Sequence, residues 1–251
     1  MRHRLILVEG PPCSGKSTVS RHIAAALADT ARVRFVDEGT GDHPADWEYH
    51  ALAPAGLLGP EARVVPLAEY SGELLEKLLP YKIYDALPWE IERPLMLDRW
   101  RQFVREAEPD AVYVFNCVLL QNPMCETMLR FDFPEAVSRE YIAEIARIIR
   151  PLAPAVVYLK NDDLAASVRR AAAERPGWLG AVIDYHASGA YGQRTGVAGF
   201  EGYIRCLEER QTRELRILAG LGLEHYIAAD PQRDWAAAEA DILAFLKGAT
   251  A

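Results

Sequence analysis

An eight-residue segment near the N-terminus constrains this chain more than any other feature. Residues 10–17 read GPPCSGKS and fit the pattern G-x-x-x-x-G-K-[S/T]. An apolar run at residues 5–8 precedes the segment, and an amphipathic helical pattern at residues 16–29 follows it. The first turn of a helix carries unpaired backbone N–H groups that can surround an anion. The motif therefore predicts a polyphosphate-binding loop (P-loop) within an α/β fold.

The backbone of this loop is expected to bind a nucleotide. Gly10 and Gly15 allow backbone angles and a close approach that a side chain would block. The N–H groups of residues 12–17, which include those of Cys13 and Ser14, are expected to wrap the phosphates. The ligand predicted in this way is ATP, and GTP stays open as an alternative.

Three side chains of the motif complete the predicted cofactor site. Lys16 is expected to reach the β- and γ-phosphates as a point charge. Ser17 is expected to give its hydroxyl group to Mg²⁺, and Thr18 is expected to support the turn. The predicted cofactors are therefore ATP and Mg²⁺.

Apolar runs alternate with helical patterns along the chain. The runs lie at residues 5–8, 33–36, 111–115, 155–159 and 225–229. Helical patterns lie at residues 16–29, 73–79, 94–107, 135–150, 162–174, 200–220 and 234–247. Pro94, Pro134 and Pro154 are expected to mark starts or breaks of elements. This alternation predicts a single α/β domain over residues 1–251, with a five-stranded parallel sheet and helices on both faces in three layers.

The segment at residues 40–110 is the longest departure from this alternation. It is rich in Pro, Gly, Trp and Tyr. We expect it to be an acceptor-side insert of the same domain that forms walls of a small-molecule pocket. A helical cover over the edge of the sheet is the alternative.

Composition excludes several classes of function. The formal net charge of −8 argues against a nucleic-acid partner and against an anionic membrane surface. No apolar run approaches the length of a membrane span, and the N-terminal run is too short for a signal sequence. The four cysteines and the histidines show no zinc spacing, so no structural metal is expected. A cytoplasmic protein with reduced thiols is predicted.

With the motif at residues 10–17 and this order of elements, the chain resembles the thymidylate kinase and deoxynucleoside kinase branch of P-loop NTPases. The similarity covers most of the chain in order of elements. It implies an ATP-dependent kinase with a lid at about residues 162–200 and a small-molecule acceptor. It also suggests a homodimer formed through a helix such as that predicted at residues 200–220.

Two acidic residues end the second apolar run. Asp37 and Glu38 stand at the sheet edge where parallel strands present ligand-binding residues. A carboxylate there can accept a proton as an acceptor hydroxyl attacks the γ-phosphate. Glu38 resembles the base of deoxynucleoside kinases, with Trp47 downstream as a substrate contact, and Asp37 is the alternative base or a Mg²⁺-shell carboxylate. The alternative for both Asp37 and Glu38 is that they only cap the following turn. Asp42 and His43 are weaker candidates for the base.

The resemblance also implies contacts with the acceptor. Arg99, or Arg101, lies in the predicted helix in which thymidylate kinases carry an acceptor-binding arginine. Asn116 ends the third apolar run, where the family has the acidic residue of an Asp-Arg or Glu-Arg pair. A neutral amide can accept a hydrogen bond from a metal-bound water but supplies no charge. Gln121 and Arg130 are further candidate contacts with a polar acceptor.

The lid implied by the resemblance contains three arginines. Arg169 and Arg175, together with Arg170, are expected to close over the transferring phosphoryl group and to stabilise its charge. A solvated basic helix face is the alternative. The Gly-rich segment at residues 188–203 is predicted to be a mobile loop.

Three functions remain open from the sequence. The first is transfer of a γ-phosphate to a hydroxyl of a nucleoside- or sugar-like compound, an antibiotic or another natural product. The second is a nucleoside monophosphate kinase of the thymidylate type. The third is a P-loop ATPase or a regulatory nucleotide-binding module, which the apolar run ending in acidic residues at 33–38 keeps open.

Overall fold

The computed structural model describes residues 2–248, and its internal contacts divide the chain into two units. The sheet unit comprises the residues up to Val36 and those from Glu108 onwards, and the insert unit is Asp37–Ala107. The insert unit nearly coincides with the segment at residues 40–110 that the sequence singles out. That both units form one functional domain remains a prediction.

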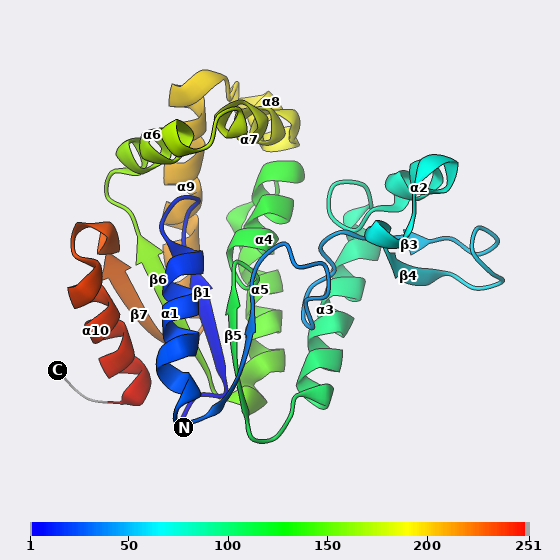
Figure 1. The fold of residues 1–251 in the computed structure, drawn as a ribbon. Coiled ribbons are helices and arrows are strands. Elements are labelled where there is room, and N and C mark those ends of the chain that lie inside the picture. The colour runs from blue at the N-terminus through cyan, green and yellow to red at the C-terminus, as the bar shows by residue number, and fades with distance from the viewer. Residues whose placement is uncertain (1, 249–251) are drawn as a thin grey trace. The chain divides into compact units, whose positions relative to one another are not determined.

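The sheet unit is built on five parallel strands in the order β2-β5-β1-β6-β7 (Figure 1). They are β1 (Leu5–Glu9), β2 (Arg32–Val36), β5 (Ala111–Asn116), β6 (Pro154–Lys160) and β7 (Glu224–Ala229). Each matches a predicted apolar run to within one residue at either end. The predicted fold class, a three-layer α/β P-loop fold, is confirmed.

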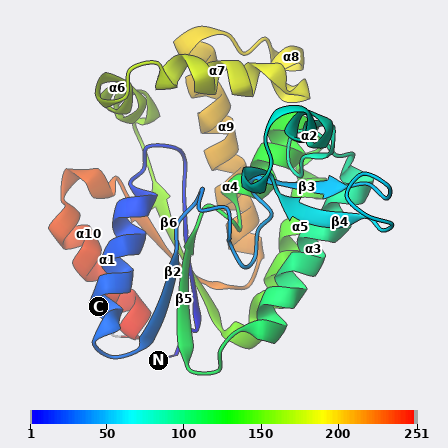
Figure 2. The ribbon, with the colours of Figure 1, turned by 45° about the vertical axis from the view of Figure 1, so that its right-hand side comes forward.

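Helices cover both faces of this sheet (Figure 2). On one face, α1 (Lys16–Ala28) and α10 (Trp235–Lys247) pack on Ile6, Val8 and their neighbours in an apolar cluster. On the other face, α9 (Gly199–Gly220) receives a hydrogen bond from β6, and α5 (Glu135–Ile149) packs against α9. Strand β1 is buried along its whole length because both faces are covered, which explains its continuous apolar sequence.

Several shorter helices lie beyond the carboxyl ends of the strands (Figure 1). They are α4 (Gln121–Met124), the π-helix η3 (Cys125–Arg130), α6 (Leu164–Glu174), α7 (Trp178–Ser188) and α8 (Ala190–Thr195). The prediction of a mobile loop at residues 188–203 is wrong, since α8 and the start of α9 occupy most of it. Gly192 serves close packing there, because a Cβ atom at this position would lie 2.3 Å from the carbonyl oxygen of His186.

The insert unit combines helices with a hairpin that the sequence analysis did not predict. Strands β3 (His50–Ala53) and β4 (Arg63–Pro66) pair antiparallel, and α2 (Gly72–Leu78) packs on them. The long helix α3 (Trp89–Glu106) carries Pro94 in its interior, so the expectation that Pro94 marks an element boundary is wrong. Proline removes a single backbone donor, and the helix continues past it. Pro134 and Pro154 do mark the starts of α5 and β6.

Short 3-10 helices complete the described structure. They are η1 (Leu67–Glu69), η2 (Leu79–Tyr81), η4 (Arg150–Leu152) and η5 (Pro231–Arg233). Within residues 2–248, no helix combines the length and the apolar character needed to cross a membrane.

A buried ion pair lies between α9 and the sheet. Arg210 Nε is 3.0 Å from Glu214 Oε1, and the two side chains are 1% and 0% exposed. The hydroxyl of Tyr158 donates to Glu214 Oε2 at 2.6 Å, and Arg210 Nη1 lies 3.5 Å from Cys125 Sγ. Burial, followed by the charge of Glu214, raises the pKa of Tyr158, so this hydroxyl stays protonated and donates. Each charge is out of water and depends on its partner.

We expect loss of one partner to cost more stability than loss of both. Arg210→Met should lower the free energy of unfolding by about 3 kcal/mol or more, because Glu214 is then buried without its counter-charge. The double variant Arg210→Met/Glu214→Leu should recover part of that loss. Urea unfolding at pH 7 measures both. A double variant less stable than the single variant would contradict this expectation, because it would show that Glu214 still stabilises the fold without Arg210, through its hydrogen bond with Tyr158.

Candidate functional site

The loop after β1 folds as a tight cradle. Gly10 and Gly15 have φ values of 141° and 95°, and Cys13 has φ 65°. A Cβ atom on Gly10 would lie 2.5 Å from the carbonyl oxygen of Leu159, and one on Gly15 would lie 2.3 Å from Cη2 of Trp235. Both positions therefore require glycine, for backbone angle and for space.

The cradle holds a buried cation and a buried hydroxyl group. Lys16 is 8% exposed, and its Nζ donates to the carbonyl oxygens of Gly10 and Pro11, each at 2.9 Å. Ser14 Oγ is buried and has no hydrogen-bond partner in the described part of the chain. Thr18, one turn into α1, is exposed. A polyphosphate chain fits this donor set, because it offers acceptors to Lys16, to Ser14 and to the backbone at the start of α1.

The predicted metal ligand lies beside the end of β5. Asn116 Nδ2 is 3.5 Å from Ser17 Oγ and 3.4 Å from Ser20 Oγ, and Asn116 is fully buried. Among the described residues, no group of three or more His, Cys, Asp or Glu side chains is placed to hold a metal ion. Mg²⁺ in nucleotide sites takes few protein ligands and several phosphate oxygens. Ser17 fits that role, with Asn116 placed to orient a metal-bound water.

Glu9 is a site residue that the sequence analysis did not identify. It ends β1 directly before Gly10 and is fully buried. Its Oε1 accepts from the N–H of Leu119 at 2.7 Å, and its Oε2 accepts from the N–H of Gln121 at 3.1 Å. Burial raises the pKa of Glu9 to about 7 against the two backbone hydrogen bonds, which lower it. The only signal in the sequence is an acidic residue at the end of a buried strand.

The predicted lid packs on the P-loop. The side chain of Cys13 joins the apolar cluster of α6, α7 and α9. Burial raises the pKa of the Cys13 thiol, and the charges of Lys16 and Arg175 act in the opposite direction, which places Arg175 in the electrostatic surroundings of the loop. Arg170 Nη1 donates to Gln232 Oε1 at 2.7 Å, and Gln232 donates to the carbonyl oxygen of Cys13. The sequence analysis did not identify Gln232, because its partners Arg170 and Cys13 are distant in sequence.

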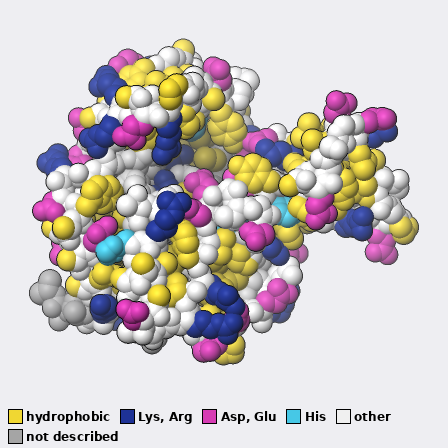
Figure 3. Space-filling view, in the orientation of Figure 1, with side chains coloured by type: hydrophobic (Ala, Val, Ile, Leu, Met, Phe, Trp, Pro, Cys, Tyr) yellow, Lys and Arg dark blue, Asp and Glu magenta, His cyan; other side chains and the backbone are white. Residues whose placement is uncertain are grey.

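The other basic residues of the sheet unit have structural contacts of their own. Basic side chains gather over α6 on the face drawn in Figure 3. The guanidinium of Arg169 lies 4.5 Å from the ring centre of Phe200 and 3.8 Å from Glu201. Arg130 pairs with Glu126 at 2.6 Å and lies over a neighbouring aromatic ring. Roles of Arg169 and Arg130 in phosphoryl or acceptor binding remain predictions.

The candidate bases lie in the insert unit. The N–H of Glu38 donates to Asp37 Oδ1 at 3.2 Å, and the N–H of Gly39 donates to Glu48 Oε2 at 2.9 Å. Glu38 is exposed and Asp37 is half-buried. Burial, followed by the charge of Asp46, raises the pKa of Glu48 to about 7. Glu48 is a second carboxylate of this segment that the sequence analysis did not single out.

His43 has a structural role in the same unit. Its side chain is 5% exposed, and its Nδ1 accepts from the N–H of Ala45 at 3.1 Å. Burial, followed by the charge of Arg99, lowers the pKa of His43 to about 3. An imidazole with so low a pKa is a poor proton acceptor at neutral pH. His43 is therefore not suited to be the base.

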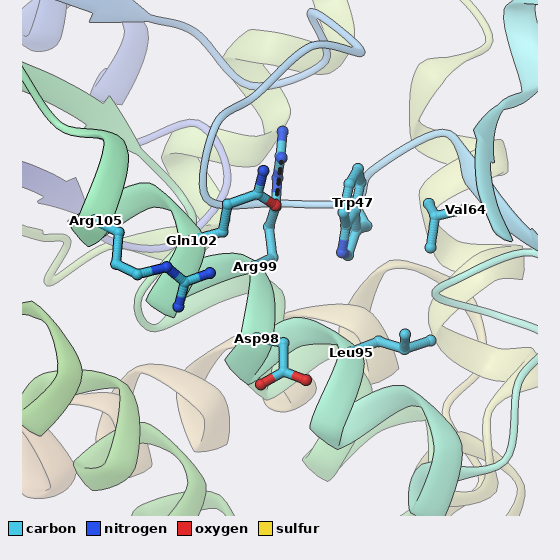
Figure 4. A pocket seen from close by; sticks show the side chains of 7 residues that line it. All are labelled: Trp47, Val64, Leu95, Asp98, Arg99, Gln102 and Arg105. Carbon is cyan, nitrogen blue, oxygen red and sulfur yellow. Dashed lines mark hydrogen bonds between the residues drawn. The ribbon is translucent and has the colours of Figure 1, made fainter.

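Arg99 and Trp47 meet in a pocket of about 400 Å³ within the insert unit (Figure 4). The guanidinium of Arg99 lies 4.0 Å from the ring centre of Trp47 and donates to the carbonyl oxygen of His43 at 2.8 Å. The other lining residues are Val64, Leu95, Asp98, Gln102 and Arg105. The structure thus brings together two predicted acceptor contacts, although their role remains a prediction. Arg101 pairs instead with Asp98, on the same helix, at 2.7 Å.

We expect Gly15→Ala to disrupt the cradle. The added methyl group meets Trp235 at a φ of 95°, which should lower stability by about 1–3 kcal/mol and abolish ADP binding. Adding Trp235→Ala to this variant should recover the part of the stability loss that comes from the clash with the ring. The part that comes from backbone strain at residue 15 should remain. Gly220→Ala is the matched control, because this helical glycine has open space around it. Urea unfolding and calorimetric titration with ADP measure the effects, and wild-type values for Gly15→Ala would contradict the geometry.

Glu9 should make stability depend on pH. Its folded-state pKa of about 7 lies above its ordinary value of 4.5, so the folded chain holds more protons between these values. The free energy of unfolding therefore falls as pH rises through this window, by about 3 kcal/mol for Glu9 alone. Glu9→Gln should remove this contribution, which appears as the wild-type minus variant difference in urea unfolding from pH 5 to pH 8. A difference that does not vary with pH would contradict the raised pKa.

Two solved structures show distant similarity to this chain. The YorR protein of Bacillus subtilis, solved in complex with phosphorylated GDP, matches with a TM-score of 0.48 and 14% identity over 97% of this chain and 95% of that chain. Thymidylate kinase from Candida albicans matches with a TM-score of 0.44 and 13% identity over 96% and 93%. No protein-family model and no curated protein sequence matches the chain. Similarities this low do not assign an activity.

Proposed function

We propose that this protein is an ATP- and Mg²⁺-dependent kinase that transfers a phosphoryl group to a hydroxyl of a small molecule. The observation that carries the proposal is the glycine cradle around the buried Lys16, at the carboxyl end of the central strand. A helical lid is packed on the same loop through Cys13. A phosphate cradle with a lid that excludes water suits phosphoryl transfer, in which hydrolysis of the nucleotide is the side reaction to avoid.

The residues of the sheet unit suit binding and charge stabilisation. When bound, ATP and Mg²⁺ would supply the reactive phosphoryl group and neutralise part of its charge. The backbone of the cradle and Lys16 would hold the phosphates, and Ser17 with Asn116 would hold the metal. Arg175, whose charge opposes the raised pKa of Cys13 in the loop, would stabilise charge on the transferring group.

The insert unit favours an acceptor with a free hydroxyl over one with a phosphate. Its segment after β2 carries several carboxylates, Asp37, Glu38, Asp46 and Glu48. Burial raises the pKa of Glu48 to about 7, and the charge of Asp46 adds to this shift, so these carboxylates act on one another. Such a field repels a phosphate and can attract the proton of a hydroxyl. A nucleoside- or sugar-like compound, an antibiotic or another natural product is the acceptor class that we propose.

A nucleoside monophosphate acceptor is the second candidate, and one observation favours it. Arg99 and Arg105 line the same pocket of the insert unit, and Arg99 lies over the ring of Trp47. Two guanidinium groups near an aromatic ring would suit a base linked to an anionic group.

An acceptor screen separates these functions. Purified protein, ATP and Mg²⁺ would be mixed with nucleosides, nucleoside monophosphates and hydroxylated antibiotics, and ADP release and product mass would be followed. Phosphorylation of a hydroxyl supports the proposal, and phosphorylation of a monophosphate supports the second candidate. Lys16→Ala is the negative control, because it removes the cradle's cation. ADP release with no phosphorylated product would refute both candidates.

The base is tested by removing one carboxylate at a time. Glu38→Gln should lower the rate of transfer to a hydroxyl about 100-fold, because the acceptor proton then lacks its base. Glu48→Gln is the matched control in the same segment and should have the smaller effect, since its carboxylate already accepts the N–H of Gly39. Single-turnover rates at saturating ATP measure both. A larger effect of Glu48→Gln would move the base to that residue.

A further inference from the structure

Glu9 ends the face of β1 that lies opposite the apolar cluster of α1 and α10, where it follows the buried Leu5 and Leu7. Side chains alternate along a strand, so Ile6 and Val8 point to the apolar cluster of α1 and α10, and Glu9 points to the opposite face. Its neighbour in the β1–β6 register is Tyr158, which donates to Glu214 of α9. Asn116, paired with Val8, points to the α1 side and meets Ser17 and Ser20. Glu9 therefore does not compete with Asn116 for the metal position.

Glu9 reaches the turn that follows β5. This turn begins at Cys117, which has a φ of 69°, a conformation that is rare outside glycine. The N–H of Cys117 donates to the carbonyl oxygen of Val8 at 3.1 Å. The N–H of Asn122 donates to the carbonyl oxygen of Cys117 at 2.9 Å. The N–H groups of Leu119 and Gln121 have Glu9 as their acceptor. One side chain thus holds both the middle of the turn and the first residue of α4.

We propose that Glu9 is a positioning residue that fixes the turn at residues 117–121 to the end of the P-loop strand. In doing so it sets Asn116 beside Ser17 and sets Gln121 at the start of α4. The proposal rests on the proposed kinase function for its catalytic consequence, but the hydrogen bonds that carry it do not. Glu9 acts through backbone groups and touches no reacting atom.

We call the two hydrogen bonds from the Leu119 and Gln121 N–H groups to Glu9 the clamp. Its strength depends on whether the carboxyl group of Glu9 is ionised. An ionised carboxylate accepts on both oxygens, whereas a protonated one turns one oxygen into a donor. Two charged groups act on the pKa of Glu9: Glu214 on α9 raises it, and Lys16 on α1 lowers it. Tyr158 lies beside Glu9 on β6. Burial opposed by backbone hydrogen bonds holds the pKa of Glu9 at about 7. The turn is therefore expected to loosen as pH falls below neutrality through local openings that leave Glu9 buried, although the free energy of global unfolding rises in the same direction.

Amide hydrogen exchange of the nucleotide-free protein tests the clamp directly. After correction for intrinsic rates, protection of the Leu119 and Gln121 amides should rise from pH 6 to pH 8 in the wild type. Glu9→Gln offers one acceptor oxygen and an NH₂ group, so protection of at least one of these amides should fall about 10-fold and lose its pH dependence. Glu9→Asp, which keeps the charge, is the second variant if the first does not fold, and it should retain the pH dependence with weaker protection.

Tyr158→Phe is the matched control. It removes a buried hydroxyl from the neighbouring position of the same face but leaves the clamp intact. In this variant, the protection of the Leu119 and Gln121 amides should depend on pH as it does in the wild type. Equal loss of protection in Tyr158→Phe and Glu9→Gln would overturn the proposal, because general destabilisation would then explain both.

The catalytic consequence is read in the pH profile of transfer to the acceptor found by the screen. The wild-type rate should fall below pH 7, and Glu9→Gln should be slow without that fall. If Glu9→Gln reduces amide protection and still shows the wild-type rate and pH profile of transfer, that result would overturn the positioning role. Absence of any phosphoryl transfer in the wild type would refute the proposed function instead, and the exchange result would still decide whether the clamp exists.

Discussion

The close approach of the P-loop backbone to the rest of the sheet unit governs the arrangement of the candidate site. At Gly10 the chain passes against the carbonyl oxygen of Leu159 on β6, and at Gly15 it passes against the ring of Trp235 on α10. These contacts leave no space for a side chain, so the loop bends tightly and directs its backbone N–H groups to the start of α1. Lys16 is then buried over the loop's own carbonyl groups. The cradle is therefore fixed by packing from two distant segments, which suits a site that has to hold a flexible polyphosphate.

The two faces of the sheet contribute to this site in different ways. The face under α1 and α10 is apolar, and its burial provides the usual driving force for folding. The face under α9 carries Glu9, Tyr158 and the pair Arg210–Glu214, all buried. Charges in such a place are weak sources of stability, because desolvation opposes their attraction. The partners of Glu9 lie just beyond the carboxyl end of β5, where an irregular turn needs fixed hydrogen-bond acceptors.

Much of the fold could be predicted because its determinants are local. The five strands are continuous apolar runs between helical patterns, and the cradle is a contiguous motif in GPPCSGKS. The hairpin β3–β4 was missed because its strands, HALA and RVVP, are too short to show a period. Pro94 was read as a boundary although α3 tolerates it. Glu9, Glu48 and Gln232 could not be found from sequence, because partners elsewhere in the fold or burial give each its role.

Asn116 places a neutral amide at the end of β5, next to Ser17 and Ser20. A carboxylate at the same position would add a negative charge next to Ser17, the residue that follows Lys16 in the chain. A neutral amide there leaves Lys16 as the dominant charge of the cradle. Metal binding would then depend on the nucleotide's own phosphates more than on the protein. In the proposed function, the protein would contribute mainly orientation: one cation for the phosphates, one hydroxyl for the metal, and a turn held in place by the buried carboxylate of Glu9.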